Sequence, residues 1–172
     1  NIIFEDASID QAIEGIVAGI WFNQGHVCCA GSRLFVQEGV VDEVLEKLDL
    51  RMQSLRIGDP LDKNTDVGAI NSRAQLRRIR GYLTQGKKEG AELHRVRGPK
   101  LPDKGFWMRP CYLTGVQPAH VVAREEIFGP VLSVMTFRTP EEALRRANNT
   151  PYGLAAGVWS DKGSRIFDVA SK

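Results

Sequence analysis

The sequence predicts an α/β fold, with a mostly parallel sheet flanked by helices. Short apolar stretches alternate along the chain with longer amphipathic stretches, the pattern of strands connected by helices. The stretch from Pro130 to Phe137 is apolar enough to be a central strand, buried on both faces. The chain has 172 residues, of which 42% are hydrophobic, so it fits one domain, or a large portion of one, with a substantial core.

The first half of the chain predicts two strands and three helices. From Ile9 to Trp21 apolar residues recur at three- and four-residue spacing, which predicts a helix with one wide buried face. Ser8 precedes this helix and Gln11 follows three residues later, so the two are expected to form a capping box. The expected strands cover 1–4 and 33–37, and the expected helices cover 9–21, about 40–55 and about 72–89.

The second half predicts four strands and two helices. Thr139 followed by Pro140 and Glu142 is typical of a helix N-terminus, with Pro at the first helical position. A polar loop containing Gly98, Pro99 and Gly105 is expected between two of the strands. The expected strands cover 91–96, 111–116, 130–137 and 155–159, and the expected helices cover 139–148 and 161–172.

Charge and length exclude several classes of protein. Lys and Arg number 23 against 21 Asp and Glu, and this balance argues against a nucleic-acid or membrane-surface partner. No apolar run is long enough to span a bilayer, and no signal-peptide pattern is present. The chain opens with Asn1 and not with Met, so we expect the natural protein to be longer.

A basic cluster lies on the helix expected at 72–89. On a helix these side chains spread over the polar face, and we expect most of them to face solvent. Contact with cofactor phosphates stays open as an alternative, whereas nucleic-acid binding is not favoured because no aromatic residues interleave. The cluster consists of Arg73, Arg77, Arg78, Arg80, Lys87 and Lys88.

The chain has three cysteines, too few for a disulfide framework, and two of them, Cys28 and Cys29, are adjacent. Free thiols favour a reducing compartment, and we expect a cytoplasmic protein, without excluding an organelle. Cys28 lies in a stretch where small residues, such as Gly25 and Gly31, let backbone and substrate approach closely. A catalytic thiol is one interpretation, and a small buried hydrophobic residue is the other.

Two carboxylates, Glu125 and Glu126, precede an aromatic residue and a Gly-Pro turn that enters the apolar strand. Glu126 is a candidate to hydrogen-bond a ligand that carries hydroxyl groups. Taken alone, this stretch is more typical of a solvated charged loop.

Together these stretches resemble the NAD(P)-dependent aldehyde dehydrogenase superfamily. Residues 22–33, Phe-Asn-Gln-Gly-His-Val-Cys-Cys-Ala-Gly-Ser-Arg, follow the family's cysteine motif with one departure. The Glu-Glu-Ile-Phe-Gly-Pro motif stands intact at 125–130, and Ala-Asn-Asn-Thr-Pro-Tyr-Gly-Leu-Ala-Ala at 147–156 matches a third family segment. The opening Asn-Ile-Ile-Phe-Glu-Asp-Ala also resembles a family stretch, so the resemblance spans the whole chain.

The resemblance implies a role for each matching residue. Cys28 matches the nucleophile, whose thiolate attacks an aldehyde to form a thiohemiacetal and then, after hydride transfer to NAD or NADP, a thioester. Glu126 matches the carboxylate that holds the nicotinamide ribose, and Phe128 the aromatic residue beside the nicotinamide. Gln75, and less securely Arg78, match further cofactor contacts. The substrate pocket is implied to include Phe22, Val27 and Cys29.

The departure from the family motif is His26, where Gln is usual. A Cys-His hydrolase is disfavoured because neighbours two apart in sequence are poorly placed for a nucleophile–base contact. A metal site built from His26, Cys28, Cys29 and Cys111 is disfavoured because no Cys-x-x-Cys pair exists, and no metal is expected. A non-catalytic structural or interaction domain with an aldehyde dehydrogenase-like fold stays open as the alternative function.

The resemblance also implies that residues 1–172 are the catalytic-domain portion of a longer enzyme, incomplete at both ends. In the family, the general-base Glu, the oxyanion-hole Asn and the cofactor-binding domain precede Asn1, and an oligomerisation strand follows Lys172. We expect the full-length enzyme to be a homo-oligomer that takes an aldehyde substrate, and the isolated chain to be inactive.

Two geometric predictions follow for the structure. Cys28 is expected in the loop that leads from the helix ending near Phe22 into the next strand. Glu126 and Phe128 are expected on the same side of the domain as Cys28, because in the family mechanism both motifs reach one cofactor ring.

Overall fold

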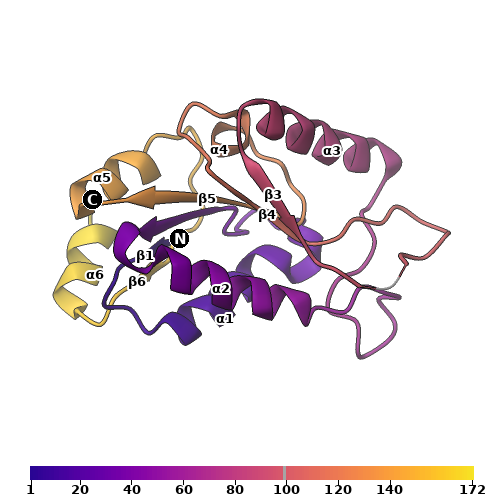
Figure 1. Cartoon of the computed structure of the whole chain (residues 1–172), viewed down its shortest axis with the longest axis horizontal. Coiled ribbons are helices and arrows are strands. Elements are labelled where there is room, and N and C mark those ends of the chain that lie inside the picture. Colours follow the sequence, from indigo (N-terminus) through magenta and orange to yellow (C-terminus); the bar gives the residue numbers. More distant parts are fainter. Residues whose placement is uncertain (99) are drawn as a thin grey trace.

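A computed structural model gives the structure of residues 1–98 and 100–172. In this part of the chain six strands form one sheet with helices on both faces (Figure 1). Pro99, in the expected polar loop, lies outside the described residues. The strands are β1 (Ile2–Ile3), β2 (Arg33–Gln37), β3 (Glu92–Arg95), β4 (Cys111–Thr114), β5 (Val131–Phe137) and β6 (Val158–Trp159).

The strand order in the sheet is β3-β4-β5-β2-β1-β6. All neighbours are parallel except β3 and β4, which pair antiparallel, so the prediction of a mostly parallel sheet is confirmed. No helix lies in the described part of the chain between β3 and β4, in keeping with their antiparallel pairing, since parallel neighbours are usually connected through a helix. The longest pairing joins β2 to β5, from Arg33 opposite Ser133 to Gln37 opposite Phe137.

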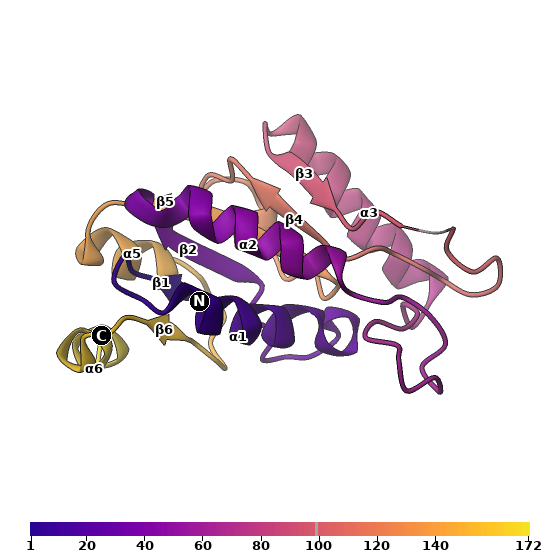
Figure 2. The same ribbon diagram turned by 60° about the horizontal axis from the view of Figure 1, so that its bottom comes forward.

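Side chains that alternate along the strands divide the core into two layers. Leu34 and Val36 pack on the face covered by α1 and α2, while Phe35 packs with residues of α3–α6 on the other face. Figures 1 and 2 both show α1 and α2 side by side. The helices are α1 (Ile9–Trp21), α2 (Val41–Gln53), α3 (Arg73–Lys88), α4 (Val121–Arg124), α5 (Pro140–Ala147) and α6 (Gly163–Ala170), with 3₁₀ turns η1 (Phe22–Gly25) and η2 (Glu38–Val40).

The predicted N-terminal cap is confirmed for α5 and wrong for α1. The Thr139 hydroxyl accepts a hydrogen bond from the Glu142 N–H, 3.3 Å, so the predicted start of α5 is confirmed. Ser8 precedes α1, but its side chain makes no capping bond, so the predicted capping box with Gln11 is wrong. The backbone explains this, because ψ is 93° at Ser8 against 154° at Thr139.

The final strand is shorter than the expected 155–159. Only Val158 and Trp159 pair with β1, because the preceding residues form an exposed loop in which Leu154 has a φ of +77°. The short helix α4 and the turns η1 and η2 were absent from the predicted elements. Within the described residues, no helix is long and apolar enough to cross a membrane.

Candidate functional site

The segment that precedes Cys28 has an unusual backbone. After α1 ends at Trp21, Asn23, Gln24 and Gly25 adopt φ values of +47°, +58° and +70° in succession. The left-handed region is costly for residues other than glycine, so contacts elsewhere must hold this turn. The Gln24 side chain supplies two of them, since its Oε1 accepts from the Gly68 N–H at 2.9 Å and its Nε2 donates to the Ala69 carbonyl at 3.2 Å.

Cys28 lies beyond this turn in the cysteine loop, residues 26–32, which runs into β2. The predicted loop position of Cys28 is therefore confirmed. Both Cys28 and Cys29 are free and exposed, whereas Cys111 is free and buried. An exposed thiol in a loop of small residues is open to a substrate from solution.

Side chains of α3 donate hydrogen bonds to backbone carbonyls of the 125–130 loop. Gln75 Nε2 donates to the carbonyls of Ile127 and Phe128, at 3.0 and 2.9 Å. Arg78 donates to the Glu126 carbonyl at 3.3 Å. Phe128 has a φ of +55°, a conformation that costs free energy for an aromatic residue and that these hydrogen bonds stabilise.

The backbone at Gly25, before the cysteine loop, lies directly against the backbone at Gly129 in the 125–130 loop. A Cβ atom on Gly25 would lie 2.1 Å from the Gly129 carbonyl oxygen, so only glycine fits at position 25. The Trp21 indole N–H also donates to the Pro130 carbonyl, 3.3 Å away in the core. The end of α1 and the start of β5 are thereby locked together, although more than a hundred residues separate them in sequence.

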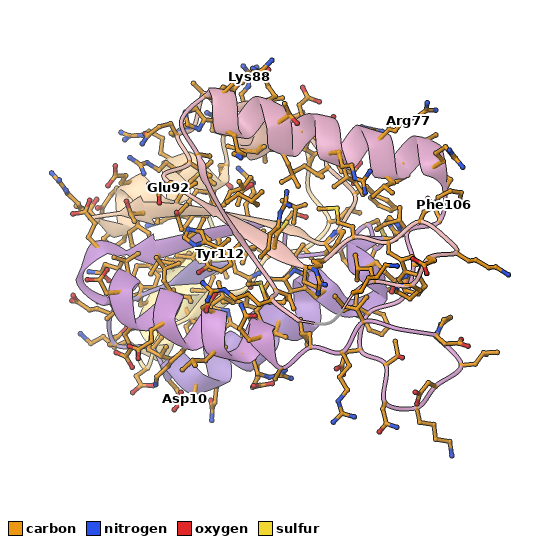
Figure 3. All side chains as sticks on the ribbon, turned by 45° about the vertical axis from the view of Figure 1, so that its right-hand side comes forward. Asp10, Arg77, Lys88, Glu92, Phe106 and Tyr112 are labelled. Carbon is orange, nitrogen blue, oxygen red and sulfur yellow. The ribbon has the colours of Figure 1, made fainter. Side chains whose placement is uncertain are left out.

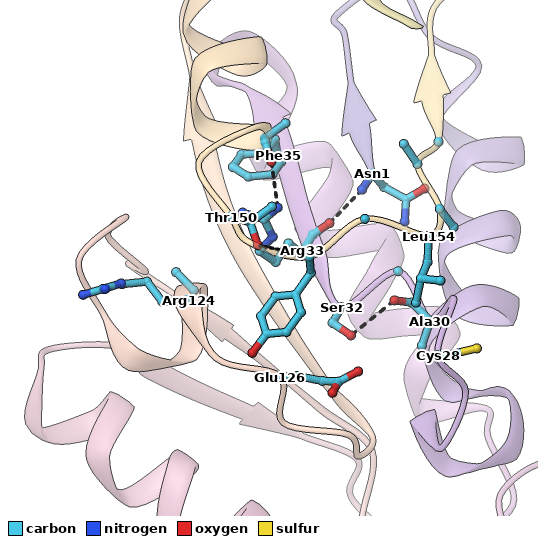
Figure 4. Close-up of a pocket in the computed structure, with 18 of the residues that line it drawn as sticks. Asn1, Cys28, Ala30, Ser32, Arg33, Phe35, Arg124, Glu126, Thr150 and Leu154 are labelled. Atoms are coloured by element: carbon cyan, nitrogen blue, oxygen red, sulfur yellow. Dashed lines mark hydrogen bonds between the residues drawn. The ribbon is translucent and has the colours of Figure 1, made fainter. Parts of the chain in front are cut away.

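A cavity of about 730 Å³ opens where these segments meet (Figure 4). Its volume is within the range of small-molecule sites. It is lined by the start of β1, by the cysteine loop and the start of β2, by residues between 123 and 128, and by residues 147–148 and 150–157. Figure 4 shows Cys28, Leu154 and Glu126 at this cavity, each on a different segment of the chain.

The cavity lies at the amino ends of the parallel strands. Its lining includes Ser32 and Arg33 at the entry to β2, Phe128 before β5 and Gly157 before β6. Ligands of open parallel sheets more often bind at the carboxyl ends. Here the candidate residues Cys28, Glu126 and Phe128 lie instead in loops that lead into the strands.

The structure brings four of the proposed site residues to one cavity. Cys28, Val27, Glu126 and Phe128 all contribute to its lining, so the expectation that the two motifs face the same side is confirmed. Phe22 and Cys29 are exposed and lie outside that lining, Phe22 with 68% of its surface accessible. A substrate role for these two residues remains a prediction.

The chain is similar to known proteins over its whole length. A sequence profile described as the aldehyde dehydrogenase family matches residues 1–172. Human mitochondrial aldehyde dehydrogenase is 44% identical over 160 residues, which cover 93% of this chain and 31% of the human protein. The chain belongs to the aldehyde dehydrogenase family.

Solved structures agree with the family assignment. An NAD-dependent aldehyde dehydrogenase from Sinorhizobium meliloti matches with a TM-score of 0.92 and 40% identity, over 99% of this chain and 34% of that one. An indole-3-acetaldehyde dehydrogenase from P. syringae, solved with NAD+ and IAA, matches with a TM-score of 0.93 and 40% identity, over 99% of this chain and 35% of that one. The chain therefore spans about a third of the length of these family members.

The segment 147–157 forms a wall of the cavity, although none of its residues was among the predicted site residues. Residues 151–156 are all exposed, and they include Tyr152 and Leu154, with 49% and 76% of their surfaces accessible. The family resemblance was the only sequence signal for this segment. Arg33 supports its start, since the guanidinium donates to the carbonyls of Arg146 and Ala147 at 3.4 and 2.8 Å.

Burial distinguishes the third thiol from the two exposed ones. Cys111 is the first residue of β4 and its side chain is buried in the core. This burial raises the pKa of its thiol to about 12. A thiol with that pKa stays protonated at neutral pH and is a poor nucleophile. Among the described residues, no group of three His, Cys, Asp or Glu side chains is placed to hold a metal ion.

His26 is not arranged as a catalytic base for Cys28. Its Nδ1 lies 2.9 Å from the Phe128 carbonyl oxygen, and its Nε2 accepts from the Asn71 N–H at 3.4 Å. Both ring nitrogens are thus engaged by backbone groups. This arrangement gives no support to a Cys-His hydrolase.

The basic cluster on α3 faces solvent. All six side chains are exposed, and Figure 3 shows Arg77 and Lys88 extending outward from the helix. Arg78 differs from the others because it also contacts the 125–130 loop. A solvated helix face accounts for the rest of the cluster.

Proposed function

We propose that residues 1–172 are the catalytic-domain portion of an enzyme that oxidises aldehydes to carboxylic acids with NAD or NADP. One observation carries the proposal: the exposed thiol of Cys28 shares a cavity with Glu126 and Phe128. The family members solved with NAD+ support the same chemistry.

Cys28 supplies the nucleophile in the proposed reaction. Its thiolate attacks the aldehyde carbon, a C–S bond forms, and the carbonyl oxygen takes up negative charge as a thiohemiacetal. The Cys28 backbone N–H is a candidate donor to that oxygen. After the carbon has lost its hydride, the resulting thioester on Cys28 is hydrolysed by water, which releases the carboxylic acid and restores the thiol.

Glu126 and Phe128 are the proposed contacts for the cofactor, which when bound supplies the hydride acceptor. The residues present fit such a group. Glu126 offers an exposed carboxylate at the cavity, able to accept hydrogen bonds from ribose hydroxyls, and Phe128 offers a half-buried aromatic ring. Gln75 and Arg78 join the cofactor site through their hydrogen bonds to the backbone of this loop.

Further properties of the full-length enzyme follow as parts of the proposal. Val27 and Cys29 flank Cys28 in the sequence, and with Phe22 they are the proposed substrate contacts for an aldehyde. The three free thiols support a reducing compartment such as the cytoplasm. A homo-oligomer is proposed for the full-length protein from the family resemblance.

The proposal is tested in the full-length parent protein with a panel of aldehydes and both cofactors, measuring NAD(P)H formation. Cys28→Ala should reduce turnover to background, because the reaction then has no nucleophile. Cys29→Ala is the matched control, since it removes the adjacent thiol. It should retain turnover, with any change falling on KM for the aldehyde.

Absence of aldehyde oxidation in the wild-type parent would contradict the proposal and favour a structural or interaction domain. Full turnover in Cys28→Ala would show that another group acts as the nucleophile. Mass spectrometry of the wild-type enzyme, quenched during turnover, should find the acyl group on the peptide that contains Cys28.

A further inference from the structure

His26 lies two residues before the proposed nucleophile, yet its contacts lead to the other motif. Its ring stacks on the Phe128 ring, with centroids 5.7 Å apart and planes 19° from parallel. Its Nδ1 lies 2.9 Å from the Phe128 carbonyl oxygen. One side chain from the cysteine loop therefore contacts both the ring and the backbone of Phe128.

The hydrogen bonds of His26 define its tautomer. Nε2 accepts from the Asn71 N–H at 3.4 Å, so it carries no proton in this arrangement. The proton of the neutral imidazole is then on Nδ1, where it donates to the Phe128 carbonyl. The ring thereby links segment 71–75, at the start of α3, to the 125–130 loop.

Phe128 needs this support because of its backbone. Its φ of +55° is unfavourable for an aromatic residue. Two donors hold its carbonyl oxygen, the Gln75 amide and the His26 imidazole, each at 2.9 Å. The bond from Gln75 comes from α3, and the bond from His26 comes from the loop that carries Cys28.

We propose that His26 is a positioning residue for the cofactor, which fixes the Phe128 backbone and ring beside Cys28. The inference rests on the proposed function, because it assumes that Phe128 flanks the cofactor ring. His26, the one residue that departs from the family's cysteine motif, then connects the loop that carries Cys28 to Phe128 in the cavity lining. His26 acts through Phe128 and takes no part in the chemical step.

The test uses three variants of the full-length parent. His26→Ala removes both hydrogen bonds and the ring stack. His26→Gln restores one donor and one acceptor, since a carboxamide carries both groups at its tip. His94→Ala is the matched control, because His94 also stacks on an aromatic ring, Tyr112, at 4.5 Å, and bonds Thr114 Oγ1 at 2.9 Å, but it lies outside the cavity lining.

The kinetic readout is the split between KM for the cofactor and kcat. His26→Ala should raise KM for NAD(P)+ about tenfold, the effect of losing about one good hydrogen bond and a ring stack. Its kcat should change less than about threefold, because the thiol and the hydride acceptor remain. His26→Gln should recover KM to within about threefold of wild type, and His94→Ala should leave it unchanged.

The second readout needs no cofactor and no turnover. Hydrogen–deuterium exchange of the cofactor-free parent should be about tenfold faster over residues 126–131 in His26→Ala than in wild type, and near wild type in His26→Gln and His94→Ala. An unchanged KM or unchanged exchange in His26→Ala would overturn the inference, while aldehyde oxidation by the wild type would still stand. If the wild type oxidises no aldehyde, the exchange experiment still decides whether His26 holds the loop.

Discussion

At the residue scale, the thiols of Cys28 and Cys111 differ in their exposure to solvent. Cys28 is exposed in a loop at the cavity, whereas Cys111 is enclosed by the sheet and its Sγ donates to the Pro130 carbonyl. Burial raises the pKa of the Cys111 thiol to about 12, and burial followed by the charge of Asp49 raises the pKa of Tyr112 to about 12. The sequence contains three cysteines but does not itself reveal this difference.

The raised pKa of Cys111 predicts how stability depends on pH. The folded state holds the thiol proton up to about pH 12, whereas the unfolded chain releases it near the ordinary value of 9.0. The free energy of unfolding is therefore unaffected by this group below that value, and it falls as the pH rises above it. The slope from Cys111 should be about 1.4 kcal/mol per pH unit.

Urea unfolding of the chain between about pH 8 and pH 10.5 measures this slope. Cys111→Ala should remove the contribution of Cys111, and Cys29→Ala should keep it because that thiol is exposed in the folded state as well. The burial argument fails if the Cys111→Ala and wild-type slopes coincide.

The backbone conformation and close packing of Gly25 predict that no other residue is tolerated there. Gly25→Ala should destabilise the chain by about 2 kcal/mol or more, because φ is +70° and a Cβ would collide with the Gly129 carbonyl. Gly19→Ala, in the last turn of α1, is the control, since no atom beyond the adjoining helix backbone lies within 4 Å of the new Cβ. It should stabilise by about 0.5–1 kcal/mol, and chemical denaturation compares the two.

At the scale of elements, the helix N-termini differ in whether a side chain caps them. Ser72 and Ser8 both stand before a helix, but only the Ser72 hydroxyl accepts a bond, from the Gln75 N–H at 3.1 Å. Ser72→Ala should therefore cost about 1 kcal/mol, and Ser8→Ala less than about 0.5 kcal/mol. Equal losses in thermal unfolding of the two variants would contradict the observed difference in capping.

Most elements were predictable from sequence because their apolar periodicity is set by burial. The helix 9–21 and the strand at 131–137 are examples, since each buries a continuous face or both faces in the core. The capping box at Ser8 failed because the residue types permit it but the backbone at that position does not. Residue types alone do not fix ψ.

The candidate site was less predictable than the core. The cysteine and glutamate motifs were recognisable by resemblance, but the turn at 23–25 and the positive φ of Phe128 carry no periodicity. Their conformations are held by distant partners such as Gln24 with Gly68 and Gln75 with Phe128. Contacts of this kind depend on the whole fold, so a local pattern does not show them.

At the scale of the whole molecule, the cavity is open along the exposed segment 151–156. We predict that the isolated chain produces no NAD(P)H with any aldehyde tested, although Cys28 should still react with thiol reagents. We expect the cofactor-binding domain and the general base to come from parts of the full-length protein outside residues 1–172, and loss of a general base alone typically costs about 10²- to 10⁴-fold. The measurement compares NAD(P)H formation by the isolated chain with that of its parent, and near-parental rates would contradict the domain assignment.

The cavity at the amino ends of the strands and the turns that follow β2 and β5 lie at opposite ends of the sheet. The turns after β2 and β5 carry Glu38 and Arg138, an exposed ion pair with 2.9 Å between Oε2 and Nε. The seven residues of β5 separate this rim from the cavity by about 20 Å. The isolated chain, tethered to an electrode through this turn, would therefore present Cys28 to thiol reagents in solution and not to the support.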